Sequence, residues 1–485
     1  ATGNGALAGG ISTTASGAQS TAIGSGSIAT GENALAGGDL SVADGDNSLA
    51  FGTNARTNIA GTNAVAMGDN STASGVASVA LGTNTTSSGS QAFSAGDGST
   101  ASGIASTALG DGALAQGAGS FATGFNTSAI GQRSVAFGTL TTADGSNSFA
   151  IGSRTNADGV ASFAGGDESD AVGSFSFAMG DGTLAGGDGS VAMGRAASAL
   201  GSGSVAIGSG PVASSSGAVA IGNGVSATGT NSVAMGSLST ASNTTAVAIG
   251  LNLTSSGLYS TAFGSNNDAT GNISFAANQG NLASGIYSTA FGNNNNARSL
   301  GEFVAGTYAV DYTPTTPAGF TASDRLFVIG NGRGTTTRSN ALTMLKNGHT
   351  GIGENTITPT NLLHLNDGDP DPLRIEGLVI DNTLDEVIVQ DANGVFHYRD
   401  ASTIGSTTRN TLDEAYDEGG AGAGRVITAD AGAVDVSGIG GLTVGTSHTL
   451  SGDRGFAAGQ NNTVSGNQSA AIGVGNVASG INSFA

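Results

Sequence analysis

The sequence of 485 residues contains no cysteine, no tryptophan and only six prolines. The absence of cysteine excludes a disulfide framework, a thiolate metal site and a cysteine nucleophile. Six prolines are too few for collagen, which also requires glycine at every third position. There is no run of about 18 apolar residues and no basic, apolar leader, so we expect neither a membrane-spanning helix nor a secretion signal in this sequence.

Charge is also scarce, at 10% of residues, and it is one-sided, with 35 acidic residues, 14 basic ones and a net charge of −21. The only lysine is Lys346, and the arginines are scattered singly. No basic patch is present to neutralise phosphates, which disfavours nucleic acids and anionic membranes as partners. We interpret the acidity as a source of solubility and of repulsion between molecules. Because 38% of the residues are apolar, the composition does not indicate disorder.

Glycine is abundant, with 84 copies, and much of it recurs at a fixed interval. Segments such as Ser78–Gly82 and Ser204–Gly208 close on an anchor glycine, which returns every fourteen residues from Gly10 to Gly306 apart from one interval of sixteen after Gly52. Of the 22 anchor positions, 21 are glycine, and 20 have alanine two residues earlier. Such a register indicates a solenoid built from one repeated coil.

Each fourteen-residue unit predicts two short strands separated by turns. In the half that ends at the anchor, small residues alternate with Val, Phe, Leu, Ile, Met or Thr, which is typical of a strand with two different faces. A second glycine recurs seven residues before the anchor, as at Gly75 and Gly145, and the recurrent Gly, Asn and Asp suit turn corners with positive φ. Coils stacked about 4.8 Å apart would form a thin parallel rod of the order of 100 Å long.

A coil this small can enclose only small side chains, so we expect Ala, Ser and Gly to point inward. The larger residues one and three positions before the anchor would then form a continuous apolar stripe outside. Because monomers rarely expose stripes of that size, we predict a symmetric oligomer that buries several stripes on one axis. A monomeric solenoid with the large residues inside is the alternative.

The repeat, as in Asn231–Gly236 (NSVAMG) and Ser128–Gly131 (SAIG), resembles the head repeat of trimeric autotransporter adhesins, the YadA-like head. The resemblance covers residues 1 to about 306 and resumes from about 446. It implies an all-β fold, namely a left-handed parallel β-roll of three chains side by side, exposed on a bacterial surface. It says little about the ligand, because such heads bind varied surfaces.

The register disappears at about Thr307, and the composition changes there. Residues 307–446 carry 26 charged residues, against 21 in residues 1–306, and all the prolines except Pro211. Residues 339–353 and 362–399 resemble connector modules of bacterial surface fibres and phage tail fibres. We predict strands, hairpin turns and one short helix in this region: strands at Leu326–Gly330, Ala341–Leu345 and Glu386–Val389, turns at Asn331-Gly332, Asn347-Gly348 and Asn393-Gly394, and a helix at Thr411–Asp417.

The register returns at Gly459 and Gly473. We therefore predict three domains: head β-roll repeats over 1–306, a β-rich connector over 307–446 and a second, truncated β-roll array over 447–485. Both ends of the sequence cut through a repeat, so we expect these residues to be a segment of a longer protein, with its signal and anchor outside the segment.

The residues that could carry chemistry are few. His349, His364, His397 and His448 show no HxxxH or HExxH spacing, and we interpret them as surface or strand residues. The run Gly330–Thr335 lacks the lysine and spacing of a phosphate-binding loop, and Gly419–Gly424 is simply rich in glycine. The carboxylates of Asp367–Pro372 alternate as in a calcium loop, but proline stands where the EF-hand needs glycine, so we favour a solvated turn. The sequence thus predicts no catalytic residue, metal site or cofactor.

Together these features predict a non-enzymatic structural adhesin, a segment of a long extracellular fibre on the bacterial cell surface. The expected partners are two further copies of the chain and an unidentified receptor on a cell or surface, with no nucleic acid and no membrane insertion. Many weak sites on one fibre would bind by avidity. One alternative is a tail-fibre segment of a phage or contractile injection device. Another is an ice-binding solenoid, although that would require threonine at fixed places.

Overall fold

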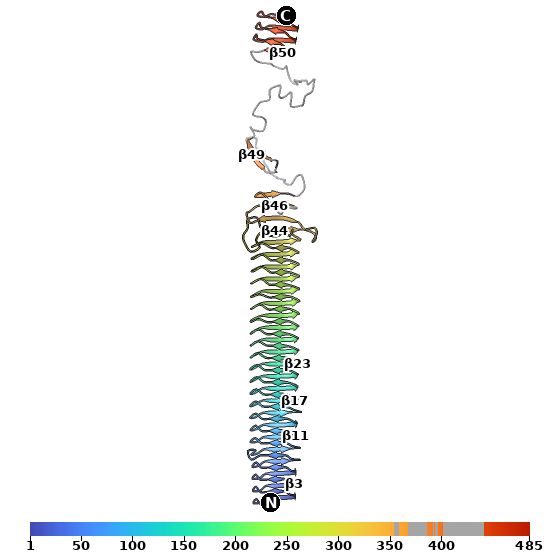
Figure 1. Cartoon of the computed structure of the whole chain (residues 1–485), viewed down its shortest axis with the longest axis vertical. Helices are drawn as coiled ribbons and strands as arrows, with labels where there is room; N and C mark the ends of the chain where they lie inside the picture. Colours follow the sequence, from blue (N-terminus) through green and yellow to red (C-terminus); the bar gives the residue numbers. More distant parts are fainter. Residues whose placement is uncertain (354–357, 367–385, 391, 393–395, 401–440) are drawn as a thin grey trace. The chain divides into compact units, whose positions relative to one another are not determined.

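The structure, a computed structural model, describes residues 1–353, 358–366, 386–390, 392, 396–400 and 441–485 (Figure 1). All the secondary structure in these ranges is β, so they include no helix that could cross a membrane. The chain divides into two compact units, Ala1–Ile375 and Glu376–Ala485.

In the first unit, each fourteen-residue coil contains a long strand that reaches the anchor glycine and a short strand on the other side of the coil (Figure 1). Consecutive long strands pair in parallel with anchor on anchor, as at Gly208 and Gly222. The short strands form a parallel ladder of their own, as at Val212 and Ser226. The predicted parallel solenoid is therefore confirmed.

The long strands are β1 (Leu7–Ile11), β3 (Thr21–Ser25), β5 (Leu35–Asp39), β7 (Leu49–Phe51), β9 (Val65–Met67), β11 (Val79–Thr83), β13 (Phe93–Asp97), β15 (Thr107–Leu109), β17 (Phe121–Phe125), β19 (Val135–Thr139), β21 (Phe149–Ser153), β23 (Phe163–Asp167), β25 (Phe177–Asp181), β27 (Val191–Arg195), β29 (Val205–Ser209), β31 (Val219–Asn223), β33 (Val233–Ser237), β35 (Val247–Leu251), β37 (Thr261–Ser265), β39 (Phe275–Gln279), β41 (Thr289–Asn293) and β43 (Phe303–Thr307).

The short strands are β2 (Thr14–Ala15), β4 (Ile28–Ala29), β6 (Val42–Ala43), β8 (Arg56–Thr57), β10 (Thr72–Ala73), β12 (Thr86–Ser87), β14 (Thr100–Ala101), β16 (Leu114–Ala115), β18 (Ser128–Ala129), β20 (Thr142–Ala143), β22 (Asn156–Ala157), β24 (Asp170–Ala171), β26 (Leu184–Ala185), β28 (Ser198–Ala199), β30 (Val212–Ala213), β32 (Ser226–Ala227), β34 (Thr240–Ala241), β36 (Thr254–Ser255), β38 (Asp268–Ala269), β40 (Leu282–Ala283) and β42 (Asn296–Ala297).

The core of the coil consists almost entirely of alanine and serine. In β29, Ala206 is fully buried, whereas Val205 and Ile207 point outward and are half-buried. The alternation follows from the strand itself, in which successive side chains point to opposite faces. The monomeric alternative with the large residues inside is therefore wrong, because the coil has room only for small ones; Val225 and Leu253 are rare larger residues in its core.

The two glycines of each coil are required for different reasons. At the anchor Gly208, φ is +130°, and a Cβ would lie 2.1 Å from the carbonyl oxygen of Gly222 in the next coil. At the second glycine, Gly75, φ is not positive, but a Cβ would lie 2.1 Å from Gly89 O. The prediction that the second glycine marks a positive-φ corner is therefore wrong, because close approach between neighbouring backbones excludes a side chain there.

The coil of sixteen residues between Gly52 and Gly68 does not interrupt the stack. Strand β7 pairs directly with β9, and Leu49 lies opposite Val65. The turn after β8, closed by a hydrogen bond from Gly61 N–H to Asn58 O at 2.7 Å, accommodates the longer loop.

Parallel stacking continues one level beyond Gly306. The next strand, β44 (Arg325–Asn331), pairs with β43 so that Gly330 lies opposite Gly306. Three more strands complete this region: β45 (Asn340–Leu345), β46 (Thr350–Ile352) and β47 (Leu363–Leu365), of which β45 is antiparallel to both β44 and β46. The predicted strands at 326–330 and 341–345 and the turn at Asn347-Gly348 are confirmed.

The predicted hairpin turn at Asn331-Gly332 is wrong. Asn331 still belongs to β44, and its N–H donates to Ser339 O at 3.1 Å. Gly332 N–H is held by Thr307 O at 2.9 Å, so the strand cannot reverse there. The chain instead turns at Gly334–Thr337, where Thr337 N–H donates to Gly334 O at 3.1 Å.

In the second unit, β48 (Glu386–Gln390) and β49 (Phe396–Asp400) form the predicted antiparallel pair. Coils then resume with β50 (Gly441–Thr446), β51 (Thr449–Leu450), β52 (Gly455–Gln460), β53 (Thr463–Val464), β54 (Ala470–Val474) and β55 (Val477–Ala478). Gly445 stacks on Gly459, so the coil pattern begins one coil earlier than the anchors at Gly459 and Gly473 had indicated. The predicted turn at Asn393-Gly394, the helix at Thr411–Asp417 and the runs Asp367–Pro372 and Gly419–Gly424 lie outside the described residues.

Candidate functional site

The outward face of the long strands carries two rows of large apolar residues, one and three positions before each anchor glycine. Phe51, Phe137 and Phe263 belong to the row nearest the anchor and are 54%, 50% and 53% exposed. Val79 and Val205 belong to the other row and are half-buried. Parallel register places each residue directly above its equivalent in the neighbouring coil, so the rows form the predicted continuous stripe along the stack.

Aromatic rings stack on one another within this stripe. The ring centroids of Phe149 and Phe163 are 5.4 Å apart, and those of Phe163 and Phe177 are 4.9 Å apart, with nearly parallel planes. Phe303 and Phe327 repeat this contact at 5.3 Å, although a longer connection separates them in the sequence. The stripe therefore extends onto β44.

The outward face of the short strands is polar and irregular. Thr72, Thr86 and Thr100 follow one another at equivalent places, but the next coil has Leu114 there. A flat threonine ladder therefore extends over no more than three consecutive coils of the first unit. The ice-binding alternative finds no support in this face.

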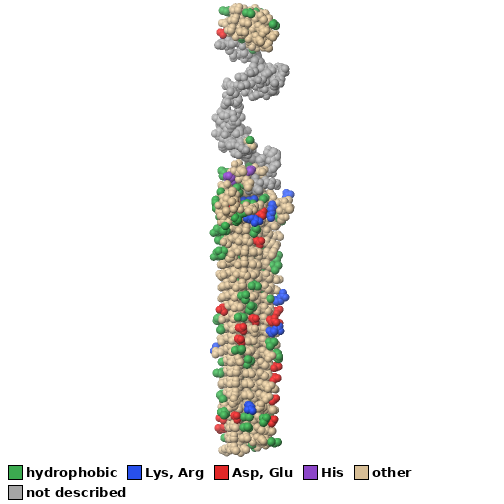
Figure 2. All heavy atoms as spheres, in the orientation of Figure 1, with side chains coloured by type: hydrophobic (Ala, Val, Ile, Leu, Met, Phe, Trp, Pro, Cys, Tyr) green, Lys and Arg blue, Asp and Glu red, His purple; other side chains and the backbone are tan. Residues whose placement is uncertain are grey.

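Acidic side chains approach one another on this side of the stack. Asn156 Nδ2 donates to Asp170 Oδ1 at 3.0 Å. Burial raises the pKa of Asp158, and the carboxylates of Asp144 and Asp170 add to the effect. Figure 2 shows that the charged side chains gather over the N-terminal part of the stack and near the C-terminal end of the first unit.

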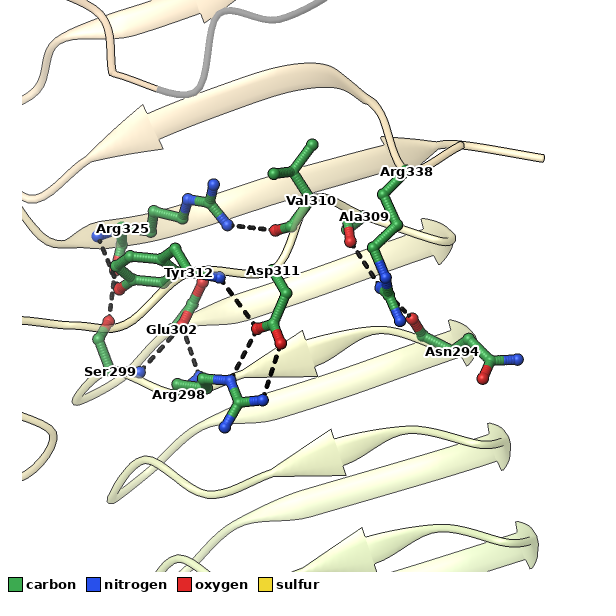
Figure 3. A network of polar contacts seen from close by, with 10 residues as sticks. All are labelled: Asn294, Arg298, Ser299, Glu302, Ala309, Val310, Asp311, Tyr312, Arg325 and Arg338. Atoms are coloured by element: carbon green, nitrogen blue, oxygen red, sulfur yellow. Dashed lines mark hydrogen bonds and ion pairs between the residues drawn. The ribbon is translucent and has the colours of Figure 1, made fainter. Parts of the chain in front are cut away.

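A buried carboxylate lies in the last regular coil. Glu302 is fully buried and occupies the inward place that Ser288 has in the preceding coil. Its Oε2 accepts hydrogen bonds from the backbone N–H groups of Arg298, at 2.7 Å, and Ser299, at 2.9 Å (Figure 3). Its Oε1 is buried without a hydrogen-bond partner among the described residues, and burial raises the pKa of Glu302 to about 7.

Three arginines surround this coil and hold the segment that follows it (Figure 3). Arg298 forms a two-pronged ion pair with Asp311, with Nε–Oδ1 and Nη2–Oδ2 distances of 2.7 and 2.8 Å. Arg325 is 2% exposed, donates to Val310 O at 2.6 Å and lies 4.2 Å from the centroid of the Tyr312 ring. Arg338 donates to Asn294 O and Ala309 O, both at 2.8 Å.

Sequence reasoning missed this network, because its residues fall where the fourteen-residue register ends. Apart from the ion pair between Arg298 and Asp311, most of its hydrogen bonds go to backbone groups of the last coil and of the segment that follows it. We therefore interpret it as a structural cap: it satisfies carbonyl and N–H groups that the next regular coil would otherwise have paired.

The four histidines lie on or between different strands, two in each unit. His349 Nδ1 lies 3.3 Å from Pro359 O, and His364 and His397 lie on β47 and β49. His448 Nδ1 accepts from Asn462 N–H at 3.3 Å, inside the second array. No group of three His, Asp or Glu residues within the described ranges could hold a metal ion.

Comparison with protein families identifies the repeat. The profile of the YadA head domain repeat (two copies) matches residues 1–27, 29–55, 60–85, 101–127, 129–155, 185–210, 227–252, 255–276, 283–299, 451–475 and 465–485. None of the curated proteins compared with the chain matches it. The matches cover more than half of the chain, and coils between the matched stretches, such as those of β23 and β25, have the same parallel register. The chain therefore belongs to the family of YadA head repeats, the β-roll heads of trimeric autotransporter adhesin-like surface fibres.

Proposed function

We propose that three copies of this chain associate along their outward stripes into a homotrimeric fibre. The observation that carries this proposal is the outward stripe of Phe, Met, Ile, Leu and Val side chains, in which Phe51, Met67 and Phe137 are exposed. An apolar face of this length in water favours association, and rotational symmetry lets three identical faces cover one another. The trimers formed by YadA-like adhesins support the same arrangement.

We further propose that the fibre attaches a bacterial cell to other cells or to surfaces, outside the cell and without catalysis. The stacked coils hold surface residues at regular spacing, and three chains present each weak site three times, so that avidity replaces strong single contacts. A trimer would carry three times the chain's net charge of −21, which keeps neighbouring fibres apart. The match to a bacterial adhesin head favours this function over a phage tail fibre.

Two measurements test the proposal. Native mass spectrometry of the chain should give three times its mass of 46.3 kDa. Latex beads coated with the chain should adhere to host cells or abiotic surfaces, and the soluble chain should compete with them. A folded monomer, or coated beads that adhere no better than bare beads, would contradict the proposal.

A further inference from the structure

One long section of the stack is almost free of charge. Residues 196–297, here called the neutral section, contain a single ionisable acid or base, Asp268, apart from tyrosine hydroxyls. The 195 residues before it contain fourteen acidic and four basic residues. Figure 2 shows few charged side chains between the N-terminal part of the stack and its cap. The neutral section thus offers no charged partner for an ionic ligand over most of its length.

Three large residues occupy one corner of successive coils in the neutral section. Tyr259, Ile273 and Tyr287 lie nine residues after their anchors, with φ of +55°, +55° and +60°. They are 53%, 47% and 59% exposed, so the fold gains little burial from them. In earlier coils of this section the same corner holds Gly203, Gly217 and Asn231, which tolerate positive φ, and the β-branched Thr245. Bulky and β-branched residues are strained in this conformation, and a run of three large exposed ones in successive coils indicates a role in binding.

The parallel register makes these residues a ladder along the stack. Thr261, Phe275 and Thr289, two positions after the three corners, lie opposite one another in adjacent strands. Tyr259 and Tyr287 are therefore two coils apart, or about 10 Å from the usual strand spacing. The three residues form one narrow row along a corner of the stacked coils. Such a row suits an extended ligand better than the broad surface of a globular protein.

The backbone N–H groups of the three corner residues are already bonded within the stack. The N–H groups of Tyr259, Ile273 and Tyr287 donate to Thr244 O, Leu258 O and Asn272 O at 3.1, 2.7 and 2.9 Å. A peptide strand could not pair with these donors, which removes the usual means of holding an extended peptide. Side-chain groups remain free: the exposed Asn272 uses its Oδ1 to accept from Leu258 N–H at 3.0 Å, and its Nδ2 donates to no described residue.

We propose that the ladder of Tyr259, Ile273 and Tyr287 binds an uncharged linear glycan that lies along the stack. This inference rests on the proposed adhesive function and names the class of its ligand. The flat tyrosine faces would stack against the apolar faces of sugar rings, and their separation is comparable with the length of a disaccharide unit in an extended chain. Free amide and hydroxyl groups beside them would bind sugar hydroxyls. Because the neutral section carries almost no charge, it favours a neutral glycan over an anionic one.

The test replaces both tyrosines by asparagine in the 485-residue chain (Tyr259→Asn with Tyr287→Asn). Asparagine tolerates positive φ and already occupies this corner at Asn231, so the coil should fold. The matched control is Phe175→Asn, at the same corner of a coil outside the neutral section, with 72% exposure and φ of +58°. Binding is measured on an array of neutral glucans, galactans and mannans, with polygalacturonate and heparin as charged probes.

The wild-type chain and Phe175→Asn should bind at least one neutral glycan and neither charged probe. The double variant should bind that glycan about tenfold or more weakly, since two aromatic contacts are lost. Failure of the wild type to bind any neutral glycan, or equal binding by the double variant, would overturn the proposal. So would a change in the oligomeric mass of the double variant, because the corner would then be a contact between copies.

The two proposals fail in different ways. If wild-type beads adhere but the chain binds no neutral glycan, the ladder proposal falls and the adhesive function stands. If the chain binds a neutral glycan through the two tyrosines but coated beads do not adhere, the adhesive function falls and the ladder remains a glycan site.

Discussion

The backbone N–H of Asn281 donates to Oδ1 of Asn267 at 2.8 Å, although the two residues are fourteen positions apart in the sequence and both are buried. Asn281 Nδ2 in turn donates to Ala277 O and Gly292 O, both at 2.7 Å. Asn295 N–H continues the ladder to Asn281 Oδ1 at 2.9 Å. One asparagine thus serves backbone groups of neighbouring coils through both ends of its side-chain amide.

We predict that Asn281→Ala loosens the stack on both sides of the substitution. It removes the side-chain hydrogen bonds to Ala277 O and Gly292 O and leaves the N–H of Asn295 without this acceptor, at a cost of about 1–3 kcal/mol for a group that stays buried and unpaired. Hydrogen exchange should become faster in peptides spanning residues 263–309 and stay unchanged before residue 200. Asn223→Ala, an exposed residue whose side chain makes no hydrogen bond to the described residues, is the control. Equal protection from hydrogen exchange in both variants would contradict this role of the stacked asparagines.

A second prediction separates the anchor glycine from a nearby glycine. Gly208→Ala should break the stack locally, since the new Cβ would lie 2.1 Å from Gly222 O and φ is +130°. Gly210→Ala meets no atom within 4 Å at φ of +67°, so it should cost only about 1 kcal/mol of backbone strain. Limited proteolysis should cut the first variant within residues 195–222 and leave the second as resistant as the wild type. If Gly210→Ala were cleaved more readily than Gly208→Ala, this account of the repeat would be refuted.

Glu302 predicts a pH dependence of the cap. Burial raises its pKa from 4.5 to about 7, so the folded chain favours the protonated acid. Its contribution to stability is complete below pH 4.5, falls as the pH rises towards 7 and is absent above that, a difference of about 3 kcal/mol. The nearby charges of Arg325 and Lys346 and the hydrogen bonds from the backbone of Ser299 and Arg298 lower the pKa of Glu302, and burial outweighs them.

Hydrogen exchange of residues 294–345, corrected for intrinsic rates, should therefore show more opening at pH 8 than at pH 5. Glu302→Gln should abolish this difference and protect the cap better than the wild type at pH 8. The exposed Glu32→Gln serves as the control. If the cap opened more at pH 5 than at pH 8, the predicted direction of its pH dependence would be wrong.

The absence of cysteine allows a direct test of which face lies on the trimer axis. A single Ile207→Cys, on the outward stripe of β29, should give cross-linked dimers with a short bifunctional maleimide. Ser226→Cys, on the outward face of the short strand β32, should remain monomeric on a denaturing gel. Cross-linking through Ser226→Cys alone would move the interface to the other face of the coil.

Much of the fold could be predicted because the repeat contains its own register. The period of fourteen, the inward alanines such as Ala206 and the outward Val205 and Ile207 follow from strand alternation in a coil with little room. The buried role of Asn281 was harder to predict, because asparagine also suits turns. The only signal for it in the sequence was its spacing of fourteen residues from Asn267 and from Asn295. Glu302 and Arg325 gave none, since their partners come from a segment whose path no local pattern determines.

The sequence by itself determined the coil, its stacking and which face is apolar, because a period-two strand between close-packed glycines leaves no other arrangement. Only the tertiary structure decided which residues that are distant in the sequence lie close together in the fold. It showed that Gly330 stacks on Gly306, that Glu302 is buried close enough to Arg325 for their charges to interact, and that Tyr259 and Tyr287 share one corner. These relations depend on which coil lies above which and on how an irregular segment closes the stack, and contacts of this kind are made through space rather than along the chain.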